Sequence, residues 1–184
     1  MAPITNNPIT NNPIPMTPSS SPIDVLILMG SDSDAPIMSA ARDALTELGL
    51  RSEMTVASAH RSPARVMRLI EAAPGRGVKV FIVGAGAAAH LAGVVAAHTT
   101  LPVVGVPIDS SALKGLDALL STVQMPPGVP VATVAIGKPG ATNAGVLAAQ
   151  MIALGDPAVA VRLVAYKEKL ADKVEDAARR LEQQ

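Results

Sequence analysis

His60 and Arg61 stand side by side in the segment VASAHRSP, between a β-branched run and a proline that can begin a helix. An imidazole has a pKa near neutrality, so it can both give and take a proton around pH 7. The neighbouring guanidinium offers a fork of donors that fits a phosphate. An isolated histidine in a loop usually has a structural role, in which its ring nitrogens are simply hydrogen-bonded. The arginine and several hydroxyls beside His60 instead favour a role in proton transfer next to a bound anion.

A second polar cluster, GSDSD, runs from Gly30 to Asp34. Hydroxyls and backbone N–H groups at a helix start suit a phosphate, and a carboxylate suits ribose hydroxyls. Serine and aspartate are also the preferred helix caps, so an ordinary capping segment would explain the same residues. This segment alone leaves both interpretations open.

The segment GAGAAAH is similar to the G-x-G-x-x-A dinucleotide fingerprint, with Gly84, Gly86 and Ala89 at the three positions. Asp109 follows at about the distance expected of a ribose-binding carboxylate. The pattern is weak because it follows the third predicted strand rather than the first, and close packing alone also produces such loops. A nicotinamide-dependent oxidoreductase is therefore a rival hypothesis, although it gives GSDSD and SAHRSP no role.

Five apolar runs position these clusters, and we predict each of them to be a strand: DVLILMG, SEMTVAS, VKVFIVGAG, LPVVGVPI and VPVATVAIG. Helices are predicted between or after them, over residues 36–48, 63–73, 88–98, 116–122 and 143–154. Strands buried on both faces read as unbroken apolar runs, and helices between them imply right-handed crossovers. The predicted fold class is α/β, a three-layer αβα open parallel sheet of flavodoxin or Rossmann type.

Ligands of such sheets bind beyond the carboxyl ends of the strands. Each predicted strand ends in a chemically interesting segment: GSDSD, SAHRSP, GAGAAAH, PIDSSALKG and GKPGATN, in chain order. We therefore expect all of them on one edge of the sheet. This convergence supports a ligand site more strongly than any single motif does.

Charge and composition exclude several classes of partner. Lys+Arg and Asp+Glu number 15 each, so no overall positive field attracts nucleic acid, and aromatic residues, at 1%, are too few to stack bases. The absence of cysteine excludes disulfides and thiolate metal sites and fits a cytoplasmic location. No apolar run reaches the roughly 18 residues of a membrane span. We expect a cytoplasmic protein that binds neither nucleic acid nor membrane.

The two ends of the chain differ from the rest. Residues 1–22 repeat a Pro-Ile-Thr-Asn-Asn unit and bury too little apolar surface to offset ordering, so we predict a disordered tail. Residues 23–184 are predicted to be a single catalytic domain, with a C-terminal helix over 157–182 that Asp156 caps. Its apolar positions are spaced three or four residues apart, so they form a stripe that needs a partner surface. Because the sheet already has enough helices for both faces, packing on a neighbouring subunit is favoured over packing on its own domain. Its apolar positions are Leu163, Tyr166, Leu170, Val174, Ala177 and Leu181.

Across about residues 24–165 the chain resembles the PurE family of purine biosynthesis. The resemblance depends on six segments that occur in one order: ILMGSDSD, SAHRSP, GAGAAAHLAG, LPVVGVPI, SALKGLDALLSTVQMPPGVPVATVAIG and GATNAGVLAAQMIAL. The resemblance implies a flavodoxin-like fold, a homo-octamer, and neither a metal nor an organic cofactor. Class I members are 5-(carboxyamino)imidazole ribonucleotide mutases, and class II members carboxylate aminoimidazole ribonucleotide with carbon dioxide. GAAAHLAG is similar to the class I sequence GGAAHLPG, so the mutase is preferred and the carboxylase is the alternative. A nucleotide-binding module that catalyses no reaction is a further alternative.

The resemblance also implies roles for the polar residues. His60 would carry the proton, while Ser31 and Asp34 would hold the ribonucleotide. Arg61, with Ser33, would bind the phosphate. The unstable carbamate substrate comes from an ATP-dependent synthetase, which implies a functional link to that enzyme, although no residue here argues for direct handover.

The remaining implied contacts surround the reacting atoms. Ser58 would lie beside the carboxylate or the base of the substrate, and a loop around Ser111 and Lys114 would cover the site. The imidazole ring and the carbon dioxide would meet Ala85, Gly86, Ala87, His90 and Leu91. Ala87 stands where the family commonly has glycine, so a positive φ there would be strained, and Ala92 replaces the usual proline.

Overall fold

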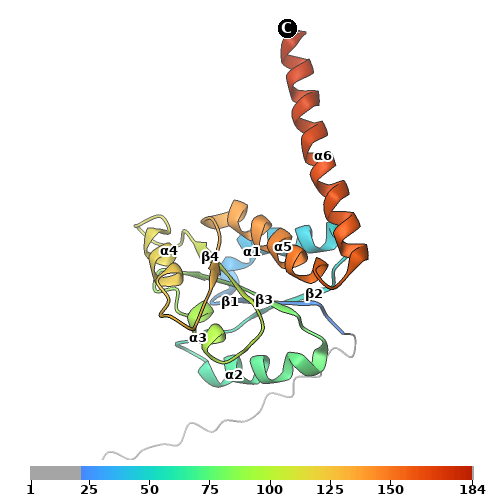
Figure 1. Ribbon diagram of the computed structural model, residues 1–184. Helices are drawn as coiled ribbons and strands as arrows, with labels where there is room; N and C mark the ends of the chain where they lie inside the picture. Colours follow the sequence, from blue (N-terminus) through green and yellow to red (C-terminus); the bar gives the residue numbers. More distant parts are fainter. Residues whose placement is uncertain (1–21, 184) are drawn as a thin grey trace, which may run out of the picture.

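The computed structural model of the protein describes residues 22–183 (Figure 1), and the predicted disordered tail, apart from Pro22, lies outside the described residues. A five-stranded parallel sheet has the strand order β2-β1-β3-β4-β5. This is the strand order of flavodoxin-like folds. The α/β prediction is thereby confirmed, and helices cover both faces of the sheet (Figure 1).

The described elements closely follow the predicted alternation. The strands are β1 (Val25–Met29), β2 (Ser52–Val56), β3 (Val80–Gly86), β4 (Val103–Ile108) and β5 (Ala132–Thr133). The helices are α1 (Ala35–Glu47), α2 (Pro63–Ala72), α3 (Leu91–Ala97), α4 (Leu116–Val123), α5 (Gly137–Ala153) and α6 (Pro157–Glu182), with short 3-10 helices η1 (Asp32–Asp34) and η2 (Pro74–Arg76).

Successive side chains of each central strand point into opposite apolar layers, as the pleat requires. Along β1, Val25 and Ile27 join the core beneath α1 and α5, whereas Leu26 and Leu28 join the core beneath α2 and α3. All four of these side chains are fully buried. The sheet is therefore a rigid platform, and the loops at its carboxyl edge take their positions from it.

Small residues let two helices of one layer approach closely. A Cβ added at Gly145 of α5 would lie 2.7 Å from the carbonyl oxygen of Ala41 and 2.9 Å from Cβ of Ala44, both on α1. The alanine- and glycine-rich composition thus builds the core by close backbone approach rather than with aromatic rings. This packing fixes α1, whose N-terminus follows the GSDSD segment.

The prediction for the fifth strand and the next helix was wrong in its boundaries. Of VPVATVAIG, only Ala132–Thr133 pairs as a strand, and α5 begins at Gly137 rather than at Asn143. Gly137 has a φ of +73°, which turns the chain directly into the helix. Pro139 lies in the first helical turn, where its missing N–H costs no hydrogen bond. GKPGATN is therefore the start of a helix and not a loop.

The predicted C-terminal helix is confirmed over Pro157–Glu182, and the Asp156 carboxylate caps it by accepting bonds from two backbone N–H groups. Its first turns pack on the core through Leu163 and Tyr166. Beyond that root the helix projects away from the rest of the chain (Figure 1), and Val174 is 67% exposed. No helix within residues 22–183 is both long and apolar enough to cross a membrane.

A cluster of charged residues joins the segments that precede β1, β2 and β3, at the amino ends of these strands. One Asp24 carboxylate oxygen accepts from the backbone N–H of Arg51 (3.1 Å), and the other accepts from Nζ of Lys79 (3.2 Å). Burial raises the pKa of Asp24, but these hydrogen bonds and the two positive side chains outweigh burial and leave the pKa below its ordinary value. The ionised form of Asp24 is thus favoured by the folded state.

Candidate functional site

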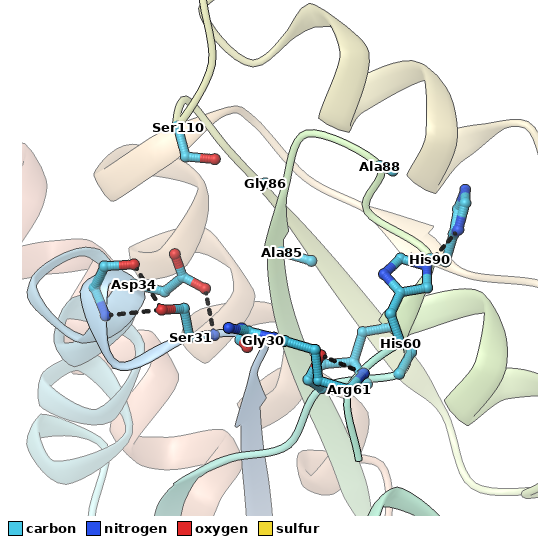
Figure 2. A pocket seen from close by; sticks show the side chains of 14 residues that line it. Gly30, Ser31, Asp34, His60, Arg61, Ala85, Gly86, Ala88, His90 and Ser110 are labelled. Atoms are coloured by element: carbon cyan, nitrogen blue, oxygen red, sulfur yellow. Dashed lines mark hydrogen bonds between the residues drawn. The ribbon is translucent and has the colours of Figure 1, made fainter. Parts of the chain in front are cut away.

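The candidate pocket lies beyond the carboxyl ends of β1, β2, β3 and β4, where the strand order reverses between β1 and β3 (Figure 2). Such a reversal is where open α/β sheets bind ligands, because the loops of neighbouring strands diverge there. Segments far apart in the sequence meet in this pocket. Its lining residues are Gly30, Ser31, Ser33, Asp34, Ser58, Ala59, His60, Arg61, Ala85, Gly86, Ala88, His90, Leu91 and Ser110.

The GSDSD segment is a helix cap and a pocket wall at once. Ser31 N donates to the Asp34 carboxylate (3.0 Å), and the Ser33 hydroxyl donates to the Ser31 hydroxyl oxygen (2.9 Å). The first bond belongs to a reciprocal capping box, in which the Ser31 side chain also accepts from a backbone N–H, and the hydroxyl bond adds to it in holding the serines in place. The two interpretations of this segment are therefore compatible, since the capping residues also line the pocket.

Asp34 is the one buried carboxylate of the pocket wall, with only 5% of the residue exposed. Burial raises its pKa, and the charge of Asp32 adds to this effect. The N–H of Ser31 and the guanidinium of Arg61 act in the opposite direction but do not cancel it. Hydrogen bonds donated by a ligand to the Asp34 oxygens would therefore stabilise its ionised form.

Arg61 joins the loops after β1 and β2. Its guanidinium donates to the carbonyl oxygen of Gly30 (2.8 Å), and its backbone N–H donates to the Ser58 hydroxyl (3.2 Å). Ser62 precedes α2 at the N-cap position, but its hydroxyl bonds back to Ser58 rather than capping the helix. The positive charge is thus held over the pocket by backbone and hydroxyl contacts, with no carboxylate among these partners.

His60 and His90 meet across the pocket (Figure 2). Nε2 of His60 lies 2.9 Å from Nδ1 of His90, and the two rings are nearly perpendicular, at 81°. One of these nitrogens must donate and the other accept, so a single proton lies between the two rings. The tautomers of both imidazoles are therefore coupled, and a proton gained by one ring changes the hydrogen bonding of the other.

The glycine–alanine loop, residues 84–90, carries His90 to this position. Ala87 has a φ of +50°. This is the left-handed conformation, which was expected to be strained if alanine replaced the glycine common in the family. Gly86 has no room for a side chain, because an added Cβ would lie 1.8 Å from Oγ of Ser110. The loop is thus held closely between β4 and the loop after β2.

Most residues selected from the sequence come together in the pocket. Those that line it are Ser31, Ser33, Asp34, Ser58, His60, Arg61, Ala85, Gly86, His90 and Leu91. Ala87, Ser111 and Lys114 do not line it, and neither does Asp109, which the oxidoreductase hypothesis needs for a ribose. Among residues 22–183, no three His, Cys, Asp or Glu side chains are grouped so that they could hold a metal ion.

Sequence reasoning missed Gly30, Ala59, Ala88 and Ser110. Each adjoins a residue that was selected: Gly30 and Ala59 lie beside residues that do line the pocket, whereas Ala88 and Ser110 line it in place of Ala87 and Ser111. A signal existed for Gly30, because a glycine that ends an apolar run marks the point where the backbone opens toward a ligand. Nothing in the PIDSS segment distinguishes Ser110 from Ser111.

The fold and the pocket together define a flavodoxin-like α/β protein with a ligand site at the strand-order reversal. Residues 24–173 match the family model described as AIR carboxylase, and the chain belongs to that family. A Thermotoga maritima protein named N5-carboxyaminoimidazole ribonucleotide mutase is 52% identical over 157 residues, covering 85% of this chain and 91% of the relative. A Bacillus subtilis protein of the same name is 53% identical over 148 residues, covering 80% and 91%.

Solved structures agree with the fold. The crystal structure of Treponema denticola PurE superposes with a TM-score of 0.77 at 28% identity, covering 85% of this chain and 97% of that one. The family resemblance found in the sequence is thereby confirmed from two directions.

Proposed function

We propose that this protein is an N5-carboxyaminoimidazole ribonucleotide mutase, which moves a carboxylate from the exocyclic nitrogen of the ribonucleotide to ring carbon 4. One observation carries the proposal: His60 stands in a pocket with an arginine, a pair of serine hydroxyls and a buried carboxylate on one side and small apolar residues on the other. A phosphorylated sugar fits the first side and a flat ring fits the second. The named relatives of about half-identical sequence support the same activity.

The anchoring groups hold the ribonucleotide. Arg61 and Ser33 bind the phosphate, because a guanidinium and a hydroxyl are its natural donors. Ser31 and Asp34 hold the ribose, whose hydroxyls donate to the carboxylate. Ser58 lies beside the carboxylate or the base. With the phosphate fixed at this end, the ring reaches the wall formed by Ala85 and Gly86.

The reaction needs a single proton carrier. The bond from the exocyclic nitrogen to the carboxylate carbon breaks, carbon dioxide leaves, and the His60 imidazolium gives its proton to that nitrogen. The electron-rich ring then attacks the trapped carbon dioxide through carbon 4. Neutral His60 removes the hydrogen from that carbon and regains its proton. Atoms and charge balance, so the overall reaction is an isomerisation and His60 ends as it began.

His90 and Leu91 close the part of the pocket where carbon dioxide is retained. The contact of His90 with Nε2 of His60 gives the catalytic imidazole a partner that accepts or donates as it changes protonation. We further propose that Ser111 and Lys114 belong to a loop that covers the site during turnover, and that Ala87 shapes the ring wall through its backbone. Dry apolar walls limit the loss of carbon dioxide to water.

The larger organisation is also a proposal. Residues 23–184 act as one catalytic domain of a cytoplasmic homo-octamer, and α6 packs on a neighbouring subunit. The exposed apolar residues beyond its root support this, since Leu170, Val174 and Leu181 are 44%, 67% and 70% exposed in the single chain. The substrate is supplied by an ATP-dependent carboxylating synthetase, because the carbamate is too unstable to accumulate.

A spectrophotometric assay with the carbamate substrate tests the function. The wild-type chain should convert it without added bicarbonate, whereas a class II carboxylase would act on aminoimidazole ribonucleotide with carbon dioxide, and a binding module would do neither. His60→Asn should lower turnover by roughly 10²–10⁴-fold, the usual contribution of a positioned acid–base group. His98→Asn is the matched control, because His98 bonds to the carbonyl of Val94 outside the pocket. Substantial turnover by His60→Asn would overturn the assignment.

A further inference from the structure

We propose that Ser121 on α4 is a positioning residue for the reaction, acting through the glycine–alanine loop on His90 and thereby on His60. This inference rests on the proposed function for its kinetic test, but its structural basis is independent of the substrate. Ser121 does not line the candidate pocket. It belongs to the LLSTVQMP segment, to which neither the sequence analysis nor the proposed mechanism assigns a role.

The contacts of the Ser121 hydroxyl connect α4 to the loop. Its oxygen accepts from the backbone N–H of Ala89 (3.1 Å). The hydroxyl proton lies within reach of the carbonyl oxygens of Asp117 (2.8 Å) and Ala118 (3.2 Å) on the helix and of Ala87 (3.4 Å) in the loop. A hydroxyl has one proton but can accept while it donates, so the bond from Ala89 is kept whichever carbonyl receives the proton. One side chain thus contacts both the strained residue of the loop and the residue before His90.

The loop needs this support for a physical reason. Ala87 has a φ of +50°, which an alanine adopts only at a cost. Ala89 is buried, and its N–H has one other described bond, to the Ala87 carbonyl two residues back (2.9 Å), which stays within the loop. Removing the Ser121 oxygen would leave this N–H with only the local bond to Ala87, and would remove the bond that ties the loop to α4, so the loop would be freer to relax. His90 follows directly, so a shift of the loop moves its ring relative to His60.

The next residue offers a matched comparison. Thr122 is buried on the same helix and its hydroxyl donates to the carbonyl of Ala118 (2.7 Å), as the serine hydroxyl does one residue earlier with Asp117. No hydrogen bond joins the Thr122 side chain to the loop among the described contacts. Thr122→Val therefore removes a helix-internal hydroxyl and nothing else, whereas Ser121→Ala removes a similar bond together with the link to the loop.

The experiment compares Ser121→Ala, Ser121→Thr and Thr122→Val in the full chain, each first shown to fold by circular dichroism and to have the wild-type oligomeric size. We expect Ser121→Ala to lower kcat by about tenfold or more with little change in KM, because the phosphate anchor is untouched while the proton carrier is misplaced. Ser121→Thr should restore kcat, because it keeps the oxygen. Thr122→Val should keep the wild-type kcat.

A second measurement does not depend on turnover. The chain has three histidines, so histidine-selective labelling gives one ring signal each for His60, His90 and His98. Ser121→Ala should shift the ring signals of His60 and His90 but leave that of His98 unchanged, and Thr122→Val should shift none. If the wild type fails to convert the carbamate, the proposed function fails while this spectrum still tests the inference.

Two outcomes would overturn the positioning role. Agreement of Ser121→Ala with Thr122→Val in both kcat and the histidine spectrum would show that the loop keeps its place without the hydroxyl. Equal losses in Ser121→Ala and Ser121→Thr would assign the effect to helix packing rather than to the hydrogen bond.

Discussion

Replacing Ala87 by glycine should stabilise the fold, which is unusual for an alanine-to-glycine change. The φ of +50° at this position is unfavourable for alanine and free of cost for glycine. The side chain is exposed, so little packing is lost with the methyl group. The change therefore isolates the backbone strain in the loop that carries His90.

The size of the effect follows from two opposing terms. A left-handed conformation costs an alanine roughly 1–2 kcal/mol. The greater conformational freedom that glycine adds to the unfolded chain offsets about 0.4–1 kcal/mol of this gain in stability. The free energy of unfolding should then rise by about 0.5–1 kcal/mol, which for a domain of this size corresponds to an increase in Tm of roughly 1–4 °C.

Thermal and urea unfolding, followed by circular dichroism at matched protein concentration, would measure this change. The control is Ala88→Gly, since Ala88 is also exposed but is not among the positive-φ residues of the described chain. That variant should lose about 0.5–1 kcal/mol. If Ala87→Gly is destabilised as much as the control, the loop does not hold the strained conformation and the reasoning fails.

Three further predictions concern neighbouring features. Gly86→Ala should keep the fold but lower kcat/KM by up to about 100-fold. The reason is that the new Cβ would lie 1.8 Å from the present position of Oγ of Ser110 and would displace that side chain. Wild-type kinetics in this variant would contradict the prediction. Asp24→Asn should be less stable than the wild type at pH 7. The lowered pKa of Asp24 makes its ionised form stabilising above about pH 4, so the difference in urea midpoint should shrink as the pH falls through the lowered pKa. Burial raises the pKa of Asp34, so the contribution of this residue to stability is lost as the pH rises from about 4 through that raised pKa. The stability of the wild type relative to Asp34→Asn should therefore fall over this range; parallel pH profiles of the two proteins would refute this.

The sequence was most informative where burial decides the pattern. The runs ending at Met29 and Gly86 are apolar on both faces, and both are central strands of the sheet. The fifth run was misleading, because Val129, Val131 and Val134 extend its apolar character on both sides of the two residues that are in register with β4. Apolar content alone does not distinguish a strand from an extended segment that packs against the edge of the sheet.

Within the site, the loops could be predicted but the orientation of each residue could not. Residues at strand ends are brought to one edge by topology, which explains why His60 and Arg61 were found. Whether Ala87 or Ala88 lines the pocket depends on the positive φ at Ala87, and whether Ser110 or Ser111 does so depends on how Gly86 admits the serine. The contact between His60 and His90 links residues 30 positions apart, and no local pattern encodes it.

The near absence of aromatic residues has a practical consequence at the root of α6. The chain has no tryptophan and a single tyrosine, Tyr166, whose ring packs where this helix leaves the core. All tyrosine emission from the folded chain therefore originates at this one ring, since the only other aromatic residue of the sequence is the buried Phe81. Dilution or a denaturant that detaches α6 would change that emission, so this natural fluorophore can report on the helix without any added dye.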